Sequence, residues 1–247
     1  FQNQKNMKLL TFSQLFILLL TFSLSSVEID SPEILMDQLW EKVEEAKKKK
    51  LPKTAIGHLD EIIKLSSKSN NFPENFRGIA HKIHYEGQIQ GKKAEEKIFL
   101  LQKERKTARE EVMPLLDCVM AIWYWQYFNQ NRWRFMQRTN TQTQPSDDIQ
   151  AWGLNRIIAE IDKHYTNALS KSDKLKEISI ESYYGIIKKG SVPLSYRPTL
   201  YDFLVHNAIQ FYQSGERAGV MASDAFVLRV ESPVFSKTED FLKWSVS

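Results

Sequence analysis

Cysteine is almost absent from this sequence, since Cys118 is the only one in 247 residues. A single thiol excludes a disulfide within the chain, so the fold has to depend on its hydrophobic core. The segment around Cys118 is apolar, and a lone cysteine in such a segment is typically buried and inert. No cysteine follows the apolar stretch at residues 9–24 either, so a lipid attachment site is lacking there. We therefore expect neither a disulfide nor a reactive thiol.

A strong excess of one charge is also lacking. The formal net charge is +4, and without Lys5 and Lys8 the chain has 32 basic against 30 acidic residues. Such a balance gives no argument for a nucleic-acid partner. The dense basic run at residues 47–50 lies where a helix is expected to end, and cations there complement the helix dipole. We favour a solvated helix end over a site for a polyanion.

The apolar run at residues 9–24 is short of the roughly 20 residues that a membrane-spanning helix needs. Met7 and Lys8 precede it, and Ser23 and Ser25 supply small residues before a cleavage site at Ser26. This is the layout of a secretory signal peptide. We predict that residues 1–25 are upstream residues and a cleaved leader, and that the mature chain is exported without a stable membrane span. A single membrane anchor is the alternative.

Apolar residues recur at helical spacing over most of the chain, which predicts an all-α fold. Ser31 is expected to cap a first helix with Pro32 at its first position, and Leu51 and Pro52 to end that helix. Residues 31–91 should then form antiparallel hairpins like those of a helical repeat. The residues predicted to face the core are Met36, Leu39, Trp40, Val43 and Ala46, then Ala55, Ile56, Leu59, Ile62 and Ile63, then Phe72, Phe76, Ile79, Ala80 and Ile83.

Residues 92–219 are predicted to form a helical region around one buried helix. A charged helix from Lys92 has a thin apolar seam, with Arg105 at an intervening position, and Pro114 suits either the first turn of a new helix or a kink in a continuous one. The following segment is apolar nearly all round, so it should be the hub of a multi-helix bundle or repeat-like array. The seam consists of Ile98, Leu101, Ala108 and Val112, and the hub of Leu115, Leu116, Val119, Met120, Ile122, Trp123, Trp125 and Tyr127.

Capping residues predict the later helices. After a polar loop at 139–148, Ser146 with Asp147 and Asp148 is expected to cap the helix that follows, and a short helix should open at Ser179 or Ile180. Thr199 with Asp202 three residues later resembles a capping box. The apolar faces are Leu154, Ile158, Ile161 and Tyr165, then Leu200, Phe203, Leu204, Ala208, Phe211 and Tyr212.

After residue 219 the pattern changes. Phe226, Leu228 and Val230 alternate with other residues, which indicates a strand in a short irregular or strand-like tail. We interpret residues 220–247 as the start of a following, truncated segment.

The sequence predicts no catalytic, cofactor-binding or metal residues and therefore no enzyme. His81 and His84 are three apart on a predicted helix, but a zinc site needs three or four ligands. The glycines at residues 87–92 lack the spacing of a phosphate-binding loop. Carboxylates that could pair in principle are expected at helix ends and on solvated faces; they are Glu110, Glu111, Asp117, Asp147 and Asp148.

Two aromatic phrases carry a resemblance to a known family. The first, WYWQYFNQNRWRFMQRT at residues 123–139, places three arginines among seven aromatic rings, and the second, RPTLYDFLVHNAIQFY, occupies residues 197–212. Together with Leu-Pro-Lys at residues 51–53, they resemble the helical region that opens many bacterial alpha-2-macroglobulin family proteins. The resemblance extends over residues 40–212.

The resemblance implies a parent protein that acts as an endopeptidase inhibitor in the bacterial periplasm or cell envelope. Cleavage of an exposed bait segment would trigger closure around the protease, and a thioester, where present, would couple to it. That thioester resembles Cys-x-Glu-Gln, whereas Val119, Met120 and Ala121 follow Cys118, so this chain is expected to hold no thioester. Its own role would be a non-catalytic scaffold or docking module, with proteases met through the parent and its own downstream domains as partners.

Two other classes stay open. A freestanding exported helical-repeat adaptor would bind protein partners in its concave face. A periplasmic enzyme would need a cleft with converging polar groups. Arginine and aromatic side chains can also stack nucleotide bases, but export and the near-neutral charge weigh against this. We expect arginine to stack on Trp133 instead, or Arg138 to cap carbonyls.

Overall fold

The computed structural model describes residues 31–91, 93–137, 148–191, 193–215 and 237–243. Within these ranges every regular element is a helix and none is a strand, which confirms the predicted all-α fold. The chain divides into two compact units, residues 1–38 and residues 39–247. The predicted leader, the polar loop before Asp148 and the predicted strand lie outside the described residues.

In the first unit, the described residues 31–38 form the start of helix α2 (Pro32–Lys48). The Ser31 hydroxyl accepts a hydrogen bond from the Ile34 backbone N–H at 3.4 Å. This contact satisfies one of the donors that a helix start leaves free, so the predicted cap at Ser31 is confirmed. Met36 is buried, as its spacing predicts.

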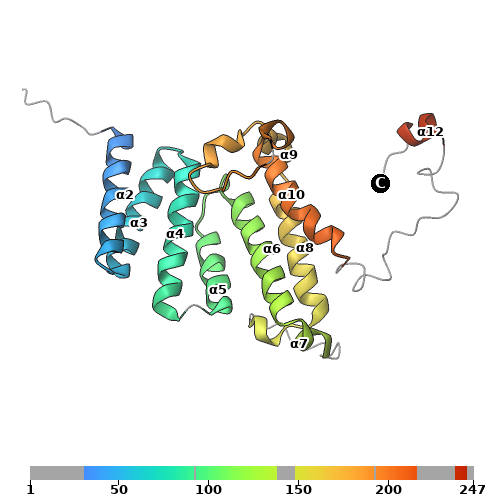
Figure 1. Ribbon diagram of the computed structural model, residues 1–247, viewed down its shortest axis with the longest axis horizontal. Coiled ribbons are helices and arrows are strands. Elements are labelled where there is room, and N and C mark those ends of the chain that lie inside the picture. The colour runs from blue at the N-terminus through green and yellow to red at the C-terminus, as the bar shows by residue number, and fades with distance from the viewer. Residues whose placement is uncertain (1–30, 92, 138–147, 192, 216–236, 244–247) are drawn as a thin grey trace, which may run out of the picture. The chain divides into compact units, whose positions relative to one another are not determined.

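The second unit continues α2 and adds α3 (Pro52–Lys68), α4 (Phe72–Gln90) and α5 (Ala94–Arg105). Lys50 has a positive φ of 54° and leaves the helical path, and Pro52 then begins α3. The Asn71 side chain caps α4, and Gly91 ends it in the left-handed conformation. Helix α3 packs against α4, and α4 against α5, in line with the predicted hairpins (Figure 1).

The predicted core positions of these helices are largely correct. In α2, α3 and α4 the residues spaced by three or four are buried, whereas the flanking positions Trp40, Ile56, Ile63, Phe72 and Ala80 are half-buried. The buried set is Leu39, Val43, Ala46, Ala55, Leu59, Ile62, Phe76, Ile79 and Ile83.

Helix α5 is shorter than its apolar seam predicts, because it ends at Arg105. The Thr107 hydroxyl donates to the Glu104 carbonyl, a local contact that competes with further helix. After a turn region, α6 (Met113–Gln130) begins with Pro114 in its first turn. The structure therefore selects a new helix at Pro114 and not a kink, and Val112 is buried just before it.

Helix α6 is the hub of this part of the molecule, as predicted. It packs against α5, α7 (Arg132–Gln137), α8 (Leu154–Leu169) and α10 (Leu200–Gln213), and Figure 1 shows it between α5 and α8. Four of the predicted hub positions are half-buried, namely Val119, Ile122, Trp123 and Trp125, whereas Tyr124, the neighbour of Trp123, is buried. The other buried side chains are Pro114, Leu115, Leu116, Asp117, Cys118, Met120, Ala121, Tyr127 and Phe128.

The aromatic phrase does not form one continuous helix. Its arginines stack within the fold: the guanidinium carbon of Arg132 lies 5.3 Å from the Phe128 ring centroid, and that of Arg134 lies 5.2 Å from the Tyr127 ring. The predicted partner Trp133 is instead 68% exposed on α7. Arg138 lies outside the described residues.

Several short elements connect the longer helices. Asp148 caps the turn η1 (Ile149–Ala151) through its contact with the Gln150 N–H, whereas α8 begins after Gly153 without a side-chain cap. The expectation that Asp148 caps the long helix is therefore wrong. The remaining elements are α9 (Ser172–Lys176), η2 (Ile180–Tyr183), which Ser179 caps, η3 (Leu194–Tyr196) and α12 (Thr238–Lys243).

The capping box at the start of α10 is confirmed. The Thr199 hydroxyl accepts from the Asp202 N–H at 3.2 Å, and an Asp202 carboxylate oxygen accepts from the Thr199 N–H at 3.0 Å. The apolar faces of α8 and α10 are largely as predicted, except that Leu154 and Phe203 are half-buried and Tyr212 is exposed. The predicted residues that are buried are Ile158, Ile161, Tyr165, Leu200, Leu204, Ala208 and Phe211.

Candidate functional site

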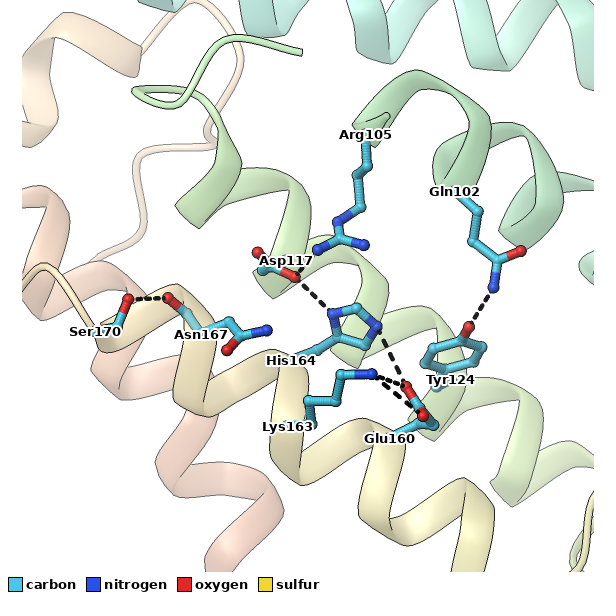
Figure 2. Close-up of polar contacts among 9 residues, drawn as sticks. All are labelled: Gln102, Arg105, Asp117, Tyr124, Glu160, Lys163, His164, Asn167 and Ser170. Atoms are coloured by element: carbon cyan, nitrogen blue, oxygen red, sulfur yellow. Dashed lines mark hydrogen bonds and ion pairs between the residues drawn. The ribbon is translucent and has the colours of Figure 1, made fainter. Parts of the chain in front are cut away.

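Among the described residues, a partly buried group of charged and polar side chains joins three helices. The Asp117 Oδ1 atom on α6 lies 2.5 Å from Nη2 of Arg105, the last residue of α5, and 2.6 Å from Nδ1 of His164 on α8. Asp117 and His164 are each 4% exposed. Figure 2 shows the Arg105 and His164 side chains converging on this one carboxylate. We refer to Arg105, Asp117, Glu160, Lys163 and His164 as the Asp117 cluster.

The cluster continues from the core toward solvent along α8. The Glu160 carboxylate lies one turn before His164, with Oε2 at 3.9 Å from His164 Nε2, and Lys163 Nζ lies 3.1 Å from the same oxygen. Basic side chains and carboxylates therefore alternate from Arg105 to Lys163 (Figure 2). This alternation compensates the charges that the fold removes from water.

The hydrogen-bond pattern assigns the proton on the imidazole. An ionised carboxylate only accepts, so a hydrogen bond to the Asp117 carboxylate requires His164 Nδ1 to donate. The Nε2 atom then faces Glu160. An Asp–His pair of this kind also orients the base of serine hydrolases, where the second nitrogen faces a nucleophilic hydroxyl. Here that nitrogen faces a carboxylate, which is no nucleophile for acyl transfer.

Cys118 follows Asp117 directly but gives the cluster no nucleophile. Burial, with a further contribution from the Asp117 charge, raises the pKa of its thiol to about 12. Because the thiolate is the reactive form, the thiol is inert at neutral pH. The prediction of a buried cysteine is confirmed.

Aromatic rings cover the imidazole. The Tyr124 ring centroid lies 5.6 Å from that of His164 and 5.3 Å from that of Trp152. The Tyr124 hydroxyl accepts a hydrogen bond from Gln102 Nε2 at 2.7 Å, and burial raises its pKa to about 12. These contacts tie α5, α6 and α8 together and hold the phenol neutral.

The structure corrects the prediction for one carboxylate and separates the others. Asp117 was expected on a solvated face, but it is buried because its partners compensate its charge. Glu110 and Glu111 are exposed and pair with Lys171 and Arg109. Asp148 is exposed at its cap, and Asp147 lies outside the described residues.

Sequence reasoning missed His164, although a signal for it exists. Position 164 falls on the same face of α8 as Ile157, Ile161 and Ala168, which are buried. A polar residue on an apolar face needs a buried partner. That requirement, applied to position 164, predicts a carboxylate facing it from another helix.

A second polar group joins α3, α4 and α5. Lys82 Nζ lies 2.8 Å from both Asp60 Oδ1 and Glu104 Oε1. Burial alone would lower the Lys82 pKa, but the hydrogen bonds to Asp60 and Glu104 outweigh it and raise this pKa above its usual value. The lysine therefore stays charged and acts as a bridge.

The other candidate residues from the sequence, His81, His84 and the glycine segment, make contacts that serve the fold. The His81 ring packs edge-on against Trp40, and burial, followed by the Arg77 charge, lowers its pKa. His84 Nε2 lies 2.8 Å from Gln88 Nε2. Residues 87–90 are the last turn of α4. Among the described residues there is no group of three or more side chains that could hold a metal ion.

Two further findings concern the whole described part of the chain. None of its helices combines the length and apolarity that crossing a membrane requires. Comparison with protein-family models, with curated proteins and with solved structures found no match.

Proposed function

We propose that this chain is a non-catalytic helical module of an exported protein similar to bacterial alpha-2-macroglobulins, whose parent traps proteases. One observation carries the proposal. The two phrases on which the resemblance rests are far apart in sequence, yet they pack together: the ring centroids of Trp125 and Phe211 are 5.6 Å apart. Phe211 also stacks on Tyr165, at 5.7 Å.

The residues of both phrases serve the fold, which supports a scaffold or docking role. In the first phrase, Tyr127 and Phe128 are buried and each contacts the ring of Phe135. In the second, Thr199 and Asp202 satisfy the backbone at the start of α10. Large aromatic side chains supply most of the stabilising area in such cores. The packing and capping contacts account for these residues without a bound substrate.

The Asp117 cluster also supports a role without chemistry. Its carboxylate and imidazole are buried and contact each other, and the carboxylate also contacts Arg105. A catalytic base has to reach a proton of its substrate. The cluster is placed to connect three helices.

The parent protein can be tested directly. We expect the genomic reading frame to continue past Ser247 for roughly a thousand residues with the alternating pattern of strand sandwiches. The full product should then slow a protease on a protein substrate but not on a short peptide, because a closed trap excludes only large substrates. A stop codon just past Ser247 would favour the freestanding adaptor, and equal cleavage of both substrates would refute the trap.

Export is tested with a form of the chain that starts at Met7. Expressed from Met7 in a Gram-negative bacterium, the protein should appear in the periplasm with a mass that begins at Ser26. A Leu18→Arg variant, with a charge inside the apolar run, should stay in the cytosol uncleaved. An intact product in the cytosol for both forms would contradict the proposal.

A further inference from the structure

A groove lies between the α2–α3 turn and the last turns of α4. Its walls combine basic and apolar side chains around a cavity of about 460 Å³. We call it the basic groove. None of the described residues that line it is acidic; they are Lys47, Lys50, Leu51, Pro52, His84, Tyr85, Gln88 and Ile89.

The apolar part of the basic groove is accessible. Leu51 is 47% exposed and Ile89 is 45% exposed, and the buried Tyr85 lies with them in the lining. Leu51 is held in place because its backbone links α2 to α3: its N–H donates to Ala46 and its carbonyl accepts from Ala55. Fixed apolar side chains around a hollow can take up one large apolar side chain of a ligand.

The positive charge around the groove disfavours cationic ligands. Five lysines stand against two glutamates between positions 44 and 53. Lys47 pairs with Glu44 and Lys49 with Glu45, but both pairs are exposed to solvent and are easily exchanged. A surface with this surplus attracts an acidic ligand.

Many carboxylates of the chain itself are already paired. Glu104 contacts Lys82, Glu110 contacts Lys171, and Glu160 contacts Lys163. The acidic ligand is therefore better sought in another polypeptide.

We propose that the basic groove binds an acidic segment of a partner protein, with one large aliphatic side chain of that segment against Leu51 and Ile89 and its carboxylates near Lys47 and Lys50. The inference deepens the docking role proposed above and rests on it, since it names the chemistry of the partner. It also accounts for the lysine run beyond the needs of a helix end, where one or two cations suffice.

The test uses the full chain and a fluorescein-labelled peptide in which two glutamates stand on each side of one leucine. Fluorescence polarisation should show saturable binding that weakens as salt rises from 50 to 500 mM. A Lys47→Glu, Lys50→Glu double variant should weaken binding about ten-fold or more, because two attractions become repulsions. Ile89→Ser should weaken it about five-fold through the lost apolar contact.

The controls separate this site from general charge attraction. Lys68→Glu changes the same kind of exposed lysine at the far end of α3, and it should leave binding within about two-fold of the unchanged chain. A peptide with glutamines for glutamates should bind at least about ten-fold more weakly. The altered side chains lie at the surface, so far-UV circular dichroism should show unchanged helix content.

Three results with the peptides would overturn the inference. These are equal binding of the glutamine peptide, unchanged binding by the Lys47→Glu, Lys50→Glu variant, and the absence of binding at millimolar peptide. Binding only to vesicles of phosphatidylglycerol, lost in the same variant, would assign the groove to a membrane surface and also overturn it. Each of these results would leave export and protease trapping by the parent untouched, so the two proposals fail separately.

Discussion

Asp117 receives two donors on a single oxygen in a buried setting, so its charge matters to the whole fold. Replacing it with asparagine removes the carboxylate that faces the Arg105 guanidinium and the buried His164 ring. We expect Asp117→Asn to lower the free energy of unfolding by about 3–5 kcal/mol, the usual cost of breaking a buried pair. Urea titration followed by circular dichroism measures this. Glu111→Gln is the control, because its exposed pair with Arg109 should contribute little to the free energy of unfolding. Equal effects of the two changes would show that the cluster is dispensable.

Buried phenols and the single thiol set the response to high pH. Burial raises the pKa of Tyr124 and of Tyr183 to about 12, and it raises those of Tyr165 and Cys118 as well. A group whose pKa is higher in the folded than in the unfolded state stabilises the fold fully below its unfolded pKa, which is about 10 for tyrosine. That stabilisation is lost as pH rises from about 10 to 12.

We therefore expect alkaline unfolding in this window, with absorbance at 295 nm and far-UV ellipticity changing together. Tyr183→Phe removes one of these groups, so it should make the loss of stability above pH 10 less steep. Gradual ionisation of all nine tyrosines with the helix content intact would contradict the prediction.

Individual residues show where sequence reasoning reaches its limit. Helical spacing placed Leu116, Met120 and Tyr127 in the core correctly, because the period of a helix fixes which residues share a face. It did not show that Tyr124 is more deeply buried than Trp123, because the spacing of apolar residues cannot indicate the buried face of a helix that is apolar on all sides. The pairing of Asp117 with His164 depends on how α6 meets α8, which no local pattern encodes.

Helix packing gives one glycine of α4 a steric role. A Cβ atom on Gly78 would lie 2.9 Å from Ile63 Cγ1 and 3.3 Å from Ile62 Cγ2, whereas a Cβ on Gly57 of α3 would have no heavy atom within 4 Å. We expect Gly78→Ala to destabilise the protein by about 1–3 kcal/mol through overpacking. Gly57→Ala should stabilise it by about 0.5–1 kcal/mol, because alanine loses less backbone freedom in a helix. Thermal unfolding of the two variants compares them, and a gain for both would show that α3 and α4 can move apart.

The start of α10 depends on its capping box. Thr199→Ala removes the hydroxyl that accepts from the Asp202 N–H, so we expect a loss of about 1 kcal/mol in unfolding free energy. Thr199→Ser keeps a hydroxyl at the same place and should cost little. Denaturant midpoints of the three proteins decide the matter, and equal losses for both changes would assign the effect to the methyl group.

Helix boundaries were predictable where a cap or a proline marks them. Ser31 and Thr199 each cap an element at the expected residue, and α2 ends just before the break expected at Leu51 and Pro52. The end of α5 at Arg105 was not predictable, because the seam from Ile98 to Val112 keeps helical spacing across the turn region. Asp148 was assigned to the wrong helix start because a short 3₁₀ turn intervenes, and such turns have weak sequence signals.

The buried residues of the second unit do not form one even core. A continuous cluster runs from Phe76 on α4 to Phe211 on α10 and contains most of α6, whereas the buried residues of α2 and α3 lie outside it. The last opening of the native state should therefore involve α6 and α8. In hydrogen exchange, we expect the slowest amides in these two helices and faster exchange in α3.

Two matched variants test this order. Leu116→Ala in α6 should speed exchange throughout the cluster, and Leu59→Ala in α3 should speed it mainly in the helices before α5. Each change removes a fully buried leucine side chain. It should lower the free energy of global unfolding by about 2–5 kcal/mol if its helix belongs to the part of the protein that opens last. Equal protection of α3 and α6 would show a single cooperative unit.

The fold class followed from the sequence because periodicity and composition act on the molecule as a whole. The Asp117 cluster and the basic groove did not, since each is made by residues from separate helices. The lysines at 47–50 were recognised as a helix end. The apolar side chains of the groove are Leu51, which follows these lysines, and Ile89, which lies almost forty residues later in α4.

Because the only thiol is sealed in the core, the folded protein should be unreactive toward maleimides. A cysteine introduced at an exposed position such as Lys68 would then be the sole attachment point for a dye or a spin label, with no need to replace Cys118. In the unmodified protein, a maleimide would react with Cys118 only after the core opens. The rate of this reaction would therefore report the rate of unfolding.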